Sequence, residues 1–345
     1  FEFAPPSGYL ALCTANLPAP AVKDPSAYVQ TDVFTGTGSE LARVLTDAGG
    51  GAYSPDMVMI KDRDTAVDNV LVDSVRGATK EINVGNETPA ESTVAQGLKS
   101  FDTSGYTLGT DTNYNASSSS NVAWTWVEDN TNAGFDIVLY TGNGANRTVA
   151  HGLSAAPEFL FIENRSRGGA QSPAWHSGIA NTTYLELNAN TGPPTSNATL
   201  WNSTSPTSST FSLGTHVMCN ANTENCVAYL WHSVEGFSKF GTYEGNGNAN
   251  GSYVHLGFRP ALIWAKSIDS TSEWHIYDNK REGYNADNDR LTMETTVEGT
   301  ADEIDFLSNG FKLRISTDPN VAETYVYCAW AERPSGLGVS QARAR

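Results

Sequence analysis

The sequence predicts an all-β protein built from three tandem, jelly-roll-like antiparallel β-sandwich domains that arise from an internal repeat of about 100 residues. Two observations predict this class. Charged residues make up 17% of the chain, and glycine, serine, threonine and asparagine are frequent, which favours short strands joined by polar turns. In addition, four sequence landmarks recur three times in the same order. The best helix candidate, residues 93–100, is short.

The first landmark is an aromatic residue that leads into two spaced glycines. It begins at Phe34, Tyr140 and Tyr243. An aromatic residue followed by a glycine-rich turn indicates the end of a strand. We therefore expect each copy to open with a strand that ends here.

The second landmark is a proline that precedes an apolar run, and it occurs at Pro55, Pro157 and Pro260. Proline has no backbone N–H, so it fits the first residue of a strand better than its middle. The runs that follow, residues 57–60, 159–162 and 262–265, are almost continuously apolar. We expect these strands to be covered on both faces.

The third and fourth landmarks are two further strands. An aromatic–x–leucine pair ends at Leu108, Leu213 and Leu313, and its alternation places both apolar side chains on one face. A closing strand ends at Trp126, Trp231 and Trp330. The prolines recur after 102 and 103 residues and the tryptophans after 105 and 99. These prolines, leucines and tryptophans are the predicted core positions of the repeat.

These spacings place the repeats at residues 28–128, 129–237 and 238–333. Residues 1–27 are expected to be an extended connector, and residues 334–345 a fraying tail. The polar stretch 128–132 is interpreted as a linker between the first two repeats. Each repeat should hold five to eight strands, and its first and last strands should pair as neighbours.

The formal net charge of −17 excludes some classes of partner. Nucleic acids and anionic membranes are bound through lysine and arginine, so neither is expected here. No apolar run is long enough to span a bilayer. The four cysteines, Cys13, Cys219, Cys226 and Cys328, do not recur at equivalent repeat positions, which argues against a disulfide framework.

Few residues suggest chemistry, and no catalytic residue or cofactor is predicted. The oxygen-rich loop with Asp278, Asp287 and Asp289 is a weak calcium candidate, because its spacing does not fit an EF-hand. A solvated loop is the favoured interpretation.

Histidine and cysteine residues supply two weaker candidates. A partial zinc set would combine His216, Cys219 and Cys226 with His232, but no other repeat has a counterpart. Two Trp-His pairs, ending at His176 and His275, occupy comparable places in the second and third repeats. Half-buried strand residues are favoured over a glycan-stacking surface.

The connector at residues 8–18 and several repeat segments carry a resemblance to a known family. The repeat segments are residues 140–144, 151–153, 257–260 and 305–314. The chain resembles the tandem β-repeats of marine tailed-phage tail-fibre-like virion proteins, in the part that follows a concanavalin-like or SPRY-like domain. The resemblance implies a non-enzymatic structural protein at the virion surface.

This resemblance also sets the expected partners and the alternatives. The expected partners are other virion subunits and a host-surface glycan or protein, with a homotrimer as the expected assembly. The alternatives are a capsid-surface decoration or fibre protein and a bacterial cell-surface carbohydrate-binding module. A glycan-degrading enzyme is the least favoured hypothesis, because aspartate and glutamate do not recur at matched positions.

Overall fold

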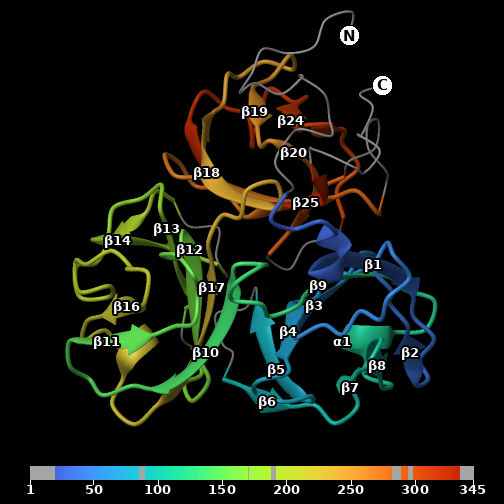
Figure 1. Ribbon diagram of the computed structural model, residues 1–345, viewed down its shortest axis with the longest axis horizontal. Coiled ribbons are helices and arrows are strands. Elements are labelled where there is room, and N and C mark those ends of the chain that lie inside the picture. Colours follow the sequence, from blue (N-terminus) through green and yellow to red (C-terminus); the bar gives the residue numbers. More distant parts are fainter. Residues whose placement is uncertain are drawn as a thin grey trace, which may run out of the picture.

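The computed structural model describes residues 20–84, 90–169, 171–187, 192–281, 289–293 and 298–334. The described residues form an all-β structure of antiparallel sheets, as the sequence predicts. Three groups of strands follow one another along the chain, and we refer to them as unit 1 (residues 29–126), unit 2 (residues 135–231) and unit 3 (residues 238–334). Figure 1 shows the three units arranged around a common centre.

Each unit has a similar series of short elements. Unit 1 comprises β1 (Val29–Thr35), β2 (Leu41–Arg43), β3 (Met57–Asp62), β4 (Asn69–Asp73), β5 (Lys80–Val84), β6 (Ser92–Thr93), β7 (Leu98–Asp102), β8 (Gly105–Leu108), α1 (Thr112–Asn115) and β9 (Ser120–Trp126). Unit 2 comprises β10 (Phe135–Thr141), β11 (Arg147–Ala150), β12 (Phe159–Asn164), β13 (Pro173–His176), β14 (Thr183–Glu186), β15 (Thr195–Ser196), β16 (Thr210–Leu213), α2 (Val217–Asn220) and β17 (Asn225–Trp231). Unit 3 comprises β18 (Ser238–Glu244), β19 (Tyr253–His255), β20 (Phe258–Ser267), β21 (His275–Asp278), β22 (Leu291–Thr292), β23 (Ile304–Leu307), β24 (Gly310–Leu313) and β25 (Thr324–Pro334).

The large sheets of the three units share one strand order. It is β1-β9-β3-β4-β5-β6 in unit 1, β10-β17-β12-β13-β14-β15 in unit 2 and β18-β25-β20-β21-β22 in unit 3. The first and last strands of each unit pair, as expected, and the closing strand lies between the first strand and the proline-led strand. The registers also correspond, since Trp126, Trp231 and Trp330 face Met57, Phe159 and Leu262 on the neighbouring strand.

A smaller sheet completes each sandwich. These sheets are β2-β8-β7, β11-β16 and β19-β24-β23, and they contain the aromatic–x–leucine strands. Leu108, Leu213 and Leu313 are almost completely buried in them. In Figure 1 the small sheets lie on the outside of the molecule and the large sheets face its centre.

The large sheets are buried on both faces, which explains their continuous apolar runs. All six residues of β3 and of β12 are buried. Met57 and Met59 join a cluster that draws residues from all three units, whereas Val58 and Ile60 join a separate cluster inside unit 1. Alternate residues of one strand therefore serve two cores: the interior of their own sandwich and the interior shared by the three units.

Tryptophans occupy the shared interior. The Trp126 ring lies 6.4 Å from Trp231 and 5.6 Å from Trp330, and the Trp231 ring lies 6.2 Å from Trp330. Trp264 contacts all three rings in edge-on geometry. Such edge-to-face contacts are favourable for aromatic rings and bury a large apolar area. The closing strands of the three units thus meet at one point.

The spaced glycines of the first landmark have a specific steric role. A Cβ at Gly36, Gly142 or Gly245 would collide with the carbonyl oxygen of Ala116, Ala221 or Val321 respectively. The second glycine of each turn, Gly38, Gly144 or Gly247, has a φ of +63° to +67°. The first position requires glycine because the turn packs directly against the backbone that precedes the closing strand. The second favours glycine because side chains other than glycine rarely adopt this positive φ.

Several details differ from the sequence-based expectations. Unit 1 has nine strands rather than eight at most, and residues 93–100 contain the end of β6 and the start of β7 instead of a helix. Pro260 lies inside β20, where the pairing with β25 is irregular on both sides of it. A β-bulge accommodates the missing N–H there, so this proline does not open its strand.

Most of the predicted connector (residues 1–19) and of the predicted tail (residues 335–345) lies outside the described residues. The described end of the connector, residues 20–27, is packed against the rest of the molecule. Val22 and Pro25 are buried, and Pro25 begins a short 3-10 helix, η2 (Pro25–Ala27). In the segment interpreted as a linker, the Asp129 side chain accepts hydrogen bonds from the backbone N–H groups of Thr131 and Asn132. The next residue, Ala133, joins the shared core. The linker is therefore an ordered turn.

Candidate functional site

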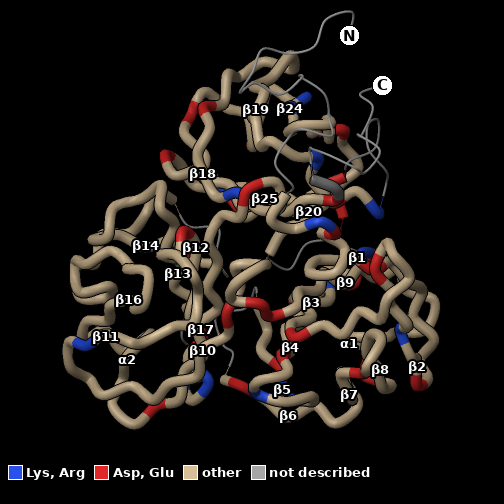
Figure 2. Tube along the Cα trace, viewed as in Figure 1, with Lys and Arg blue, Asp and Glu red and all other residues tan. Residues whose placement is uncertain are grey.

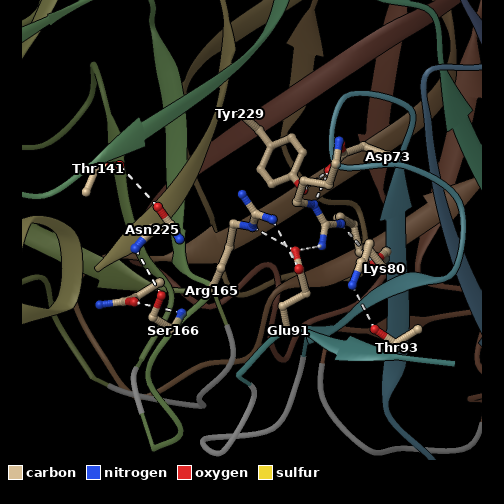
Figure 3. Close-up of polar contacts among 12 residues, drawn as sticks. Asp73, Lys80, Glu91, Thr93, Thr141, Arg165, Ser166, Asn225 and Tyr229 are labelled. Atoms are coloured by element: carbon tan, nitrogen blue, oxygen red, sulfur yellow. Dashed lines mark hydrogen bonds and ion pairs between the residues drawn. The ribbon is translucent and has the colours of Figure 1, made fainter. Parts of the chain in front are cut away.

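The first junction, between units 1 and 2, holds a buried network of charged residues (Figure 3). Arg76 forms an ion pair with Asp73, and both side chains are fully buried. The Tyr229 hydroxyl of unit 2 donates to Asp73 Oδ2 over 2.6 Å. Glu91 accepts from Arg76 over 3.3 Å and from Arg165 Nε of unit 2 over 2.7 Å. Two carboxylates and two guanidinium groups therefore connect the two units.

The third junction, between units 3 and 1, repeats this network with equivalent residues. Arg281 forms an ion pair with Asp278 over 2.6 Å, and Trp124 Nε1 of unit 1 donates to Asp278 Oδ2 over 3.0 Å. Arg281 also contacts Glu298, which accepts from Arg63 Nε of unit 1 over 2.8 Å. The strand registers pair Met57 with Asp73 and Leu262 with Asp278, so the two aspartates occupy the same position.

At the second junction, between units 2 and 3, a neutral and an apolar residue take the places of the buried aspartate and arginine. Strand register places His176 where the other units have Asp73 and Asp278. His176 Nε2 lies 3.1 Å from the carbonyl oxygen of Tyr327. Ile179 stands three residues after His176, at the place of Arg76 and Arg281, and it packs against the shared core. Burial lowers the pKa of His176 to about 4, so this side chain is uncharged at neutral pH.

The charged networks are arranged for structure. Burial alone would raise the pKa of Asp278, but the guanidinium of Arg281 and the hydrogen bonds to the carboxylate lower it. Burial likewise opposes ionisation of Glu91, and Arg165 lowers its pKa. A buried charge is tolerated only when it is paired and its hydrogen bonds are satisfied. Each network therefore orients two units relative to each other.

Unit 3 carries an open surface groove. It has a volume of about 420 Å³ and lies between β18 and β19, where Lys239, Glu244, Tyr253 and His255 line it. Tyr253 is 46% exposed and its hydroxyl donates to Asn309 Oδ1 over 2.8 Å. A half-exposed aromatic ring beside charged groups suits contact with a polar surface or a glycan.

The residues of the calcium candidate are only partly placed. Asp287 lies outside the described residues. The Asp278 carboxylate faces Arg281 and Trp124, and it also accepts from the backbone N–H groups of Lys280 and Arg281. Within the described ranges, no three histidine, cysteine, aspartate or glutamate side chains converge as a metal site would require. Calcium binding through this loop remains a sequence-based hypothesis.

The residues of the zinc candidate do not converge. Cys226 lies near the start of β17 and His232 follows its end, so at about 3.3 Å per residue they are roughly 20 Å apart. His216 caps α2, and its Nδ1 accepts from the backbone N–H of Met218. Cys219, Cys226 and Cys328 are buried free thiols, and Cys13 lies outside the described residues. A four-ligand zinc site is therefore wrong for this set.

The two Trp-His pairs are not equivalent in the fold. His176 pairs with Phe159 on the neighbouring strand. In unit 3 the residue equivalent to Phe159 is Leu262, but His275 pairs with Ala265, three positions further along the strand. His275 Nε2 lies 2.9 Å from Asp318 Oδ2 inside unit 3. Both histidines are almost completely buried. A glycan-stacking surface built on the two pairs is therefore wrong.

The predicted core positions lie inside the structure. Trp126, Trp231 and Trp330 are at most 1% exposed, and Pro55, Pro157 and Pro260 are buried as well. The prediction did not foresee that the tryptophans of different units contact one another. It also overlooked the Asp-x-x-Arg pattern at Asp73 and Asp278, which was visible in two of the three repeats.

A profile of the family described as a domain of unknown function, DUF7483, matches residues 24–334. The chain belongs to this family. No curated protein matches the chain. The matched range begins at Asp24, which caps η2, and ends at the last residue of β25. A single family domain therefore spans all three units and their junctions, in agreement with their shared core.

The helices of the described residues are only a few residues long, and none is long and apolar enough to cross a membrane. Acidic positions occur on all three units (Figure 2).

Proposed function

We propose that this chain is a non-enzymatic structural subunit of a virion, most specifically of a tail fibre or a similar surface appendage. The observation that carries the proposal is the single core to which all three units contribute. Three sandwiches fused in this way form a stiff block. A stiff block with many exterior loops suits a part that must keep its shape while it contacts other surfaces.

The distribution of charged residues supports a structural role. Two charged clusters, around Asp73 and Asp278, are buried at junctions, and arginine pairs with the carboxylate in each. Their pairing leaves little freedom for proton transfer, which requires a group with access to a substrate. We assign these clusters to the stability of the block.

Contact with a host surface or with another subunit is proposed for the outer face. The groove beside Tyr253 and His255 is the site we favour for this contact. We further propose a homotrimer. Because the three units of one chain already enclose their own centre, copies of the chain must associate through outer surfaces. Light scattering at micromolar concentration tests this, and a monomer mass would contradict it.

The location of the chain decides between the proposal and its alternatives. Purified particles should contain the chain by mass spectrometry, and a cryo-EM map should place the three-unit block on the tail or fibre. Density on the capsid surface would favour a decoration protein. Absence from purified particles, together with binding of the isolated chain on a glycan array, would overturn the proposal in favour of a carbohydrate-binding module.

A further inference from the structure

A pocket lies at the third junction, where the ring of units is not covalently closed. Turns of the chain connect unit 1 to unit 2 and unit 2 to unit 3, but the end of unit 3 meets the start of unit 1 without a connection. The pocket has a volume of about 190 Å³. It is bounded by the start of β1, the turn after β2, and parts of β20 and β25 near Ala261 and Glu332.

The equivalent corners of units 1 and 2 are filled by a carboxylate. Asp56 accepts from the Ser74 hydroxyl over 2.7 Å and from the backbone N–H of Glu128 over 2.8 Å. Glu158 accepts from the backbone N–H of Ser233 over 2.6 Å. Ala261 occupies the equivalent position in unit 3, as one shared backbone hydrogen bond shows. The carbonyls of Asp56, Glu158 and Ala261 accept from the backbone N–H groups of Ser74, Ser177 and Asn279 respectively. Unit 3 therefore lacks the carboxylate that closes this corner elsewhere.

Two of the residues that line the resulting pocket carry buried polar groups without partners. The Asn279 side chain is 5% exposed, and neither its Oδ1 nor its Nδ2 has a hydrogen-bond partner among the residues that the structure places. The same holds for the hydroxyl of Thr31, which also lines the pocket. Burying such groups without a partner costs free energy. These atoms have almost no accessible surface in this conformation. An occupant that supplies both donors and acceptors would remove the cost once the Asn279 side chain turns toward it.

The lining favours a small neutral occupant rich in hydroxyl groups. The Asn279 amide offers one acceptor and two donors, and the Thr31 hydroxyl offers both functions. Charges of both signs line the pocket, because Lys280 lies there beside the carboxylates of Asp47 and Glu332. Arg259 pairs with Glu332 over 3.3 Å. This balance favours a neutral occupant, whose hydroxyl groups can donate to the carboxylates. Val29 and Ala331 supply an apolar wall, which suits the C–H face of a sugar ring.

We propose that this pocket binds a single neutral sugar residue of hexose size. This proposal rests on the proposed function only for the source of the sugar, which would be a glycan on the host surface. The binding itself is a property of the isolated chain. A chain found outside the particle would refute the proposed function and leave sugar binding intact, and a failure to bind sugars would leave the location on the particle unaffected.

The test is a titration of the full chain with free glucose, galactose, mannose and N-acetylglucosamine, followed by saturation-transfer NMR and by amide chemical shifts. For a ligand of roughly 12 non-hydrogen atoms we expect saturable binding with a Kd on the order of 1 mM. Shifts should centre on the residues around Asn279 and Thr31. If none of the four sugars shows saturable binding at this site, the proposal is overturned.

Two variants and a control make the test specific. Asn279→Ala removes the unpartnered amide and should weaken binding at least tenfold. Ala261→Asp restores the carboxylate present in units 1 and 2, should provide Asn279 with a partner and should abolish binding while the melting temperature stays equal or rises. Ser177→Ala, at the matching position of unit 2, should leave binding unchanged. Equal binding by wild type, Asn279→Ala and Ala261→Asp would overturn the proposal.

Discussion

At the scale of single residues, Trp231 has the most central position in the shared core. Its ring contacts Trp126, Trp264 and Trp330 from the other two units. We expect Trp231→Ala to lower the free energy of unfolding by about 3–5 kcal/mol, because it leaves a cavity that three units line. Chemical denaturation monitored by circular dichroism measures the change.

The matched control for this variant is Trp231→Phe, which keeps an aromatic ring and should lose clearly less stability. If Trp231 serves the core, its substitution lowers the stability of the protein, and any loss of ligand or partner binding follows from that lower stability. Loss of ligand or partner binding at an unchanged melting temperature would contradict it.

Glu163 makes the stability of the protein depend on pH. Burial raises the pKa of this carboxyl from its ordinary 4.5 to about 7. Because the folded state holds the proton more tightly, the stabilising contribution is complete below about pH 4.5 and is lost as the pH rises through 7. We therefore expect Glu163→Gln to stabilise the protein at pH 8, by up to about 3 kcal/mol, and to change little at pH 4.5.

Melting temperatures between pH 4.5 and 8.5 measure this effect. The exposed Glu235→Gln substitution is the control and should shift both ends of the range equally. An equal gain at pH 4.5 and pH 8 in Glu163→Gln would show that Glu163 is not the titrating group.

At the scale of elements, a buried asparagine holds the glycine turn of each unit. Asn115, Asn220 and Asn320 occupy equivalent positions ahead of the closing strand. Asn220 accepts from the backbone N–H of Asn143 over 3.0 Å and donates to the carbonyls of Ala145 and Gly214. We expect Asn220→Ala to destabilise the protein by about 2–4 kcal/mol, because it leaves several buried backbone groups without partners.

Equilibrium unfolding in urea measures the cost of Asn220→Ala. The nearby exposed Asn222→Ala should remain within about 0.5 kcal/mol of wild type. Equal stability of both variants would mean that the asparagine does not hold the turn.

These elements also show how far sequence patterns reach. Strands led by Pro55 and Pro157 were predictable because continuous burial imposes an apolar run. The asparagines were not recognised, although they recur at spacings of 105 and 100 residues. Asparagine is common in this chain, so a single buried one among many exposed ones gives no composition signal. The irregular pairing at Pro260 was equally hidden, since a bulge depends on the partner strand.

At the scale of the whole molecule, the sequence predicted the repeated unit and missed how the units associate. The linker predicted at residues 128–132 implied that the first two units pack as separate domains. Ala133 and Phe135, which follow it, instead belong to the shared core. The contacts that fix the arrangement join residues far apart in sequence, such as Asp73 with Tyr229. A repeat pattern reports what the copies have in common. Junction residues recur only in part, since Asp73 and Asp278 occupy one equivalent position and His176 replaces them in unit 2.

The shared core leads to a prediction about cooperativity. Independent beads would unfold in separate steps, whereas units that share one core should unfold together. We expect one calorimetric transition for the full chain, with equal calorimetric and van't Hoff enthalpies. Arg281→Ala removes one partner of the buried network at the third junction and should cost about 3–5 kcal/mol. If the units are coupled, that substitution shifts the whole transition to lower temperature. A transition that splits, with units 1 and 2 melting as in wild type, would show that the junctions do not couple the units.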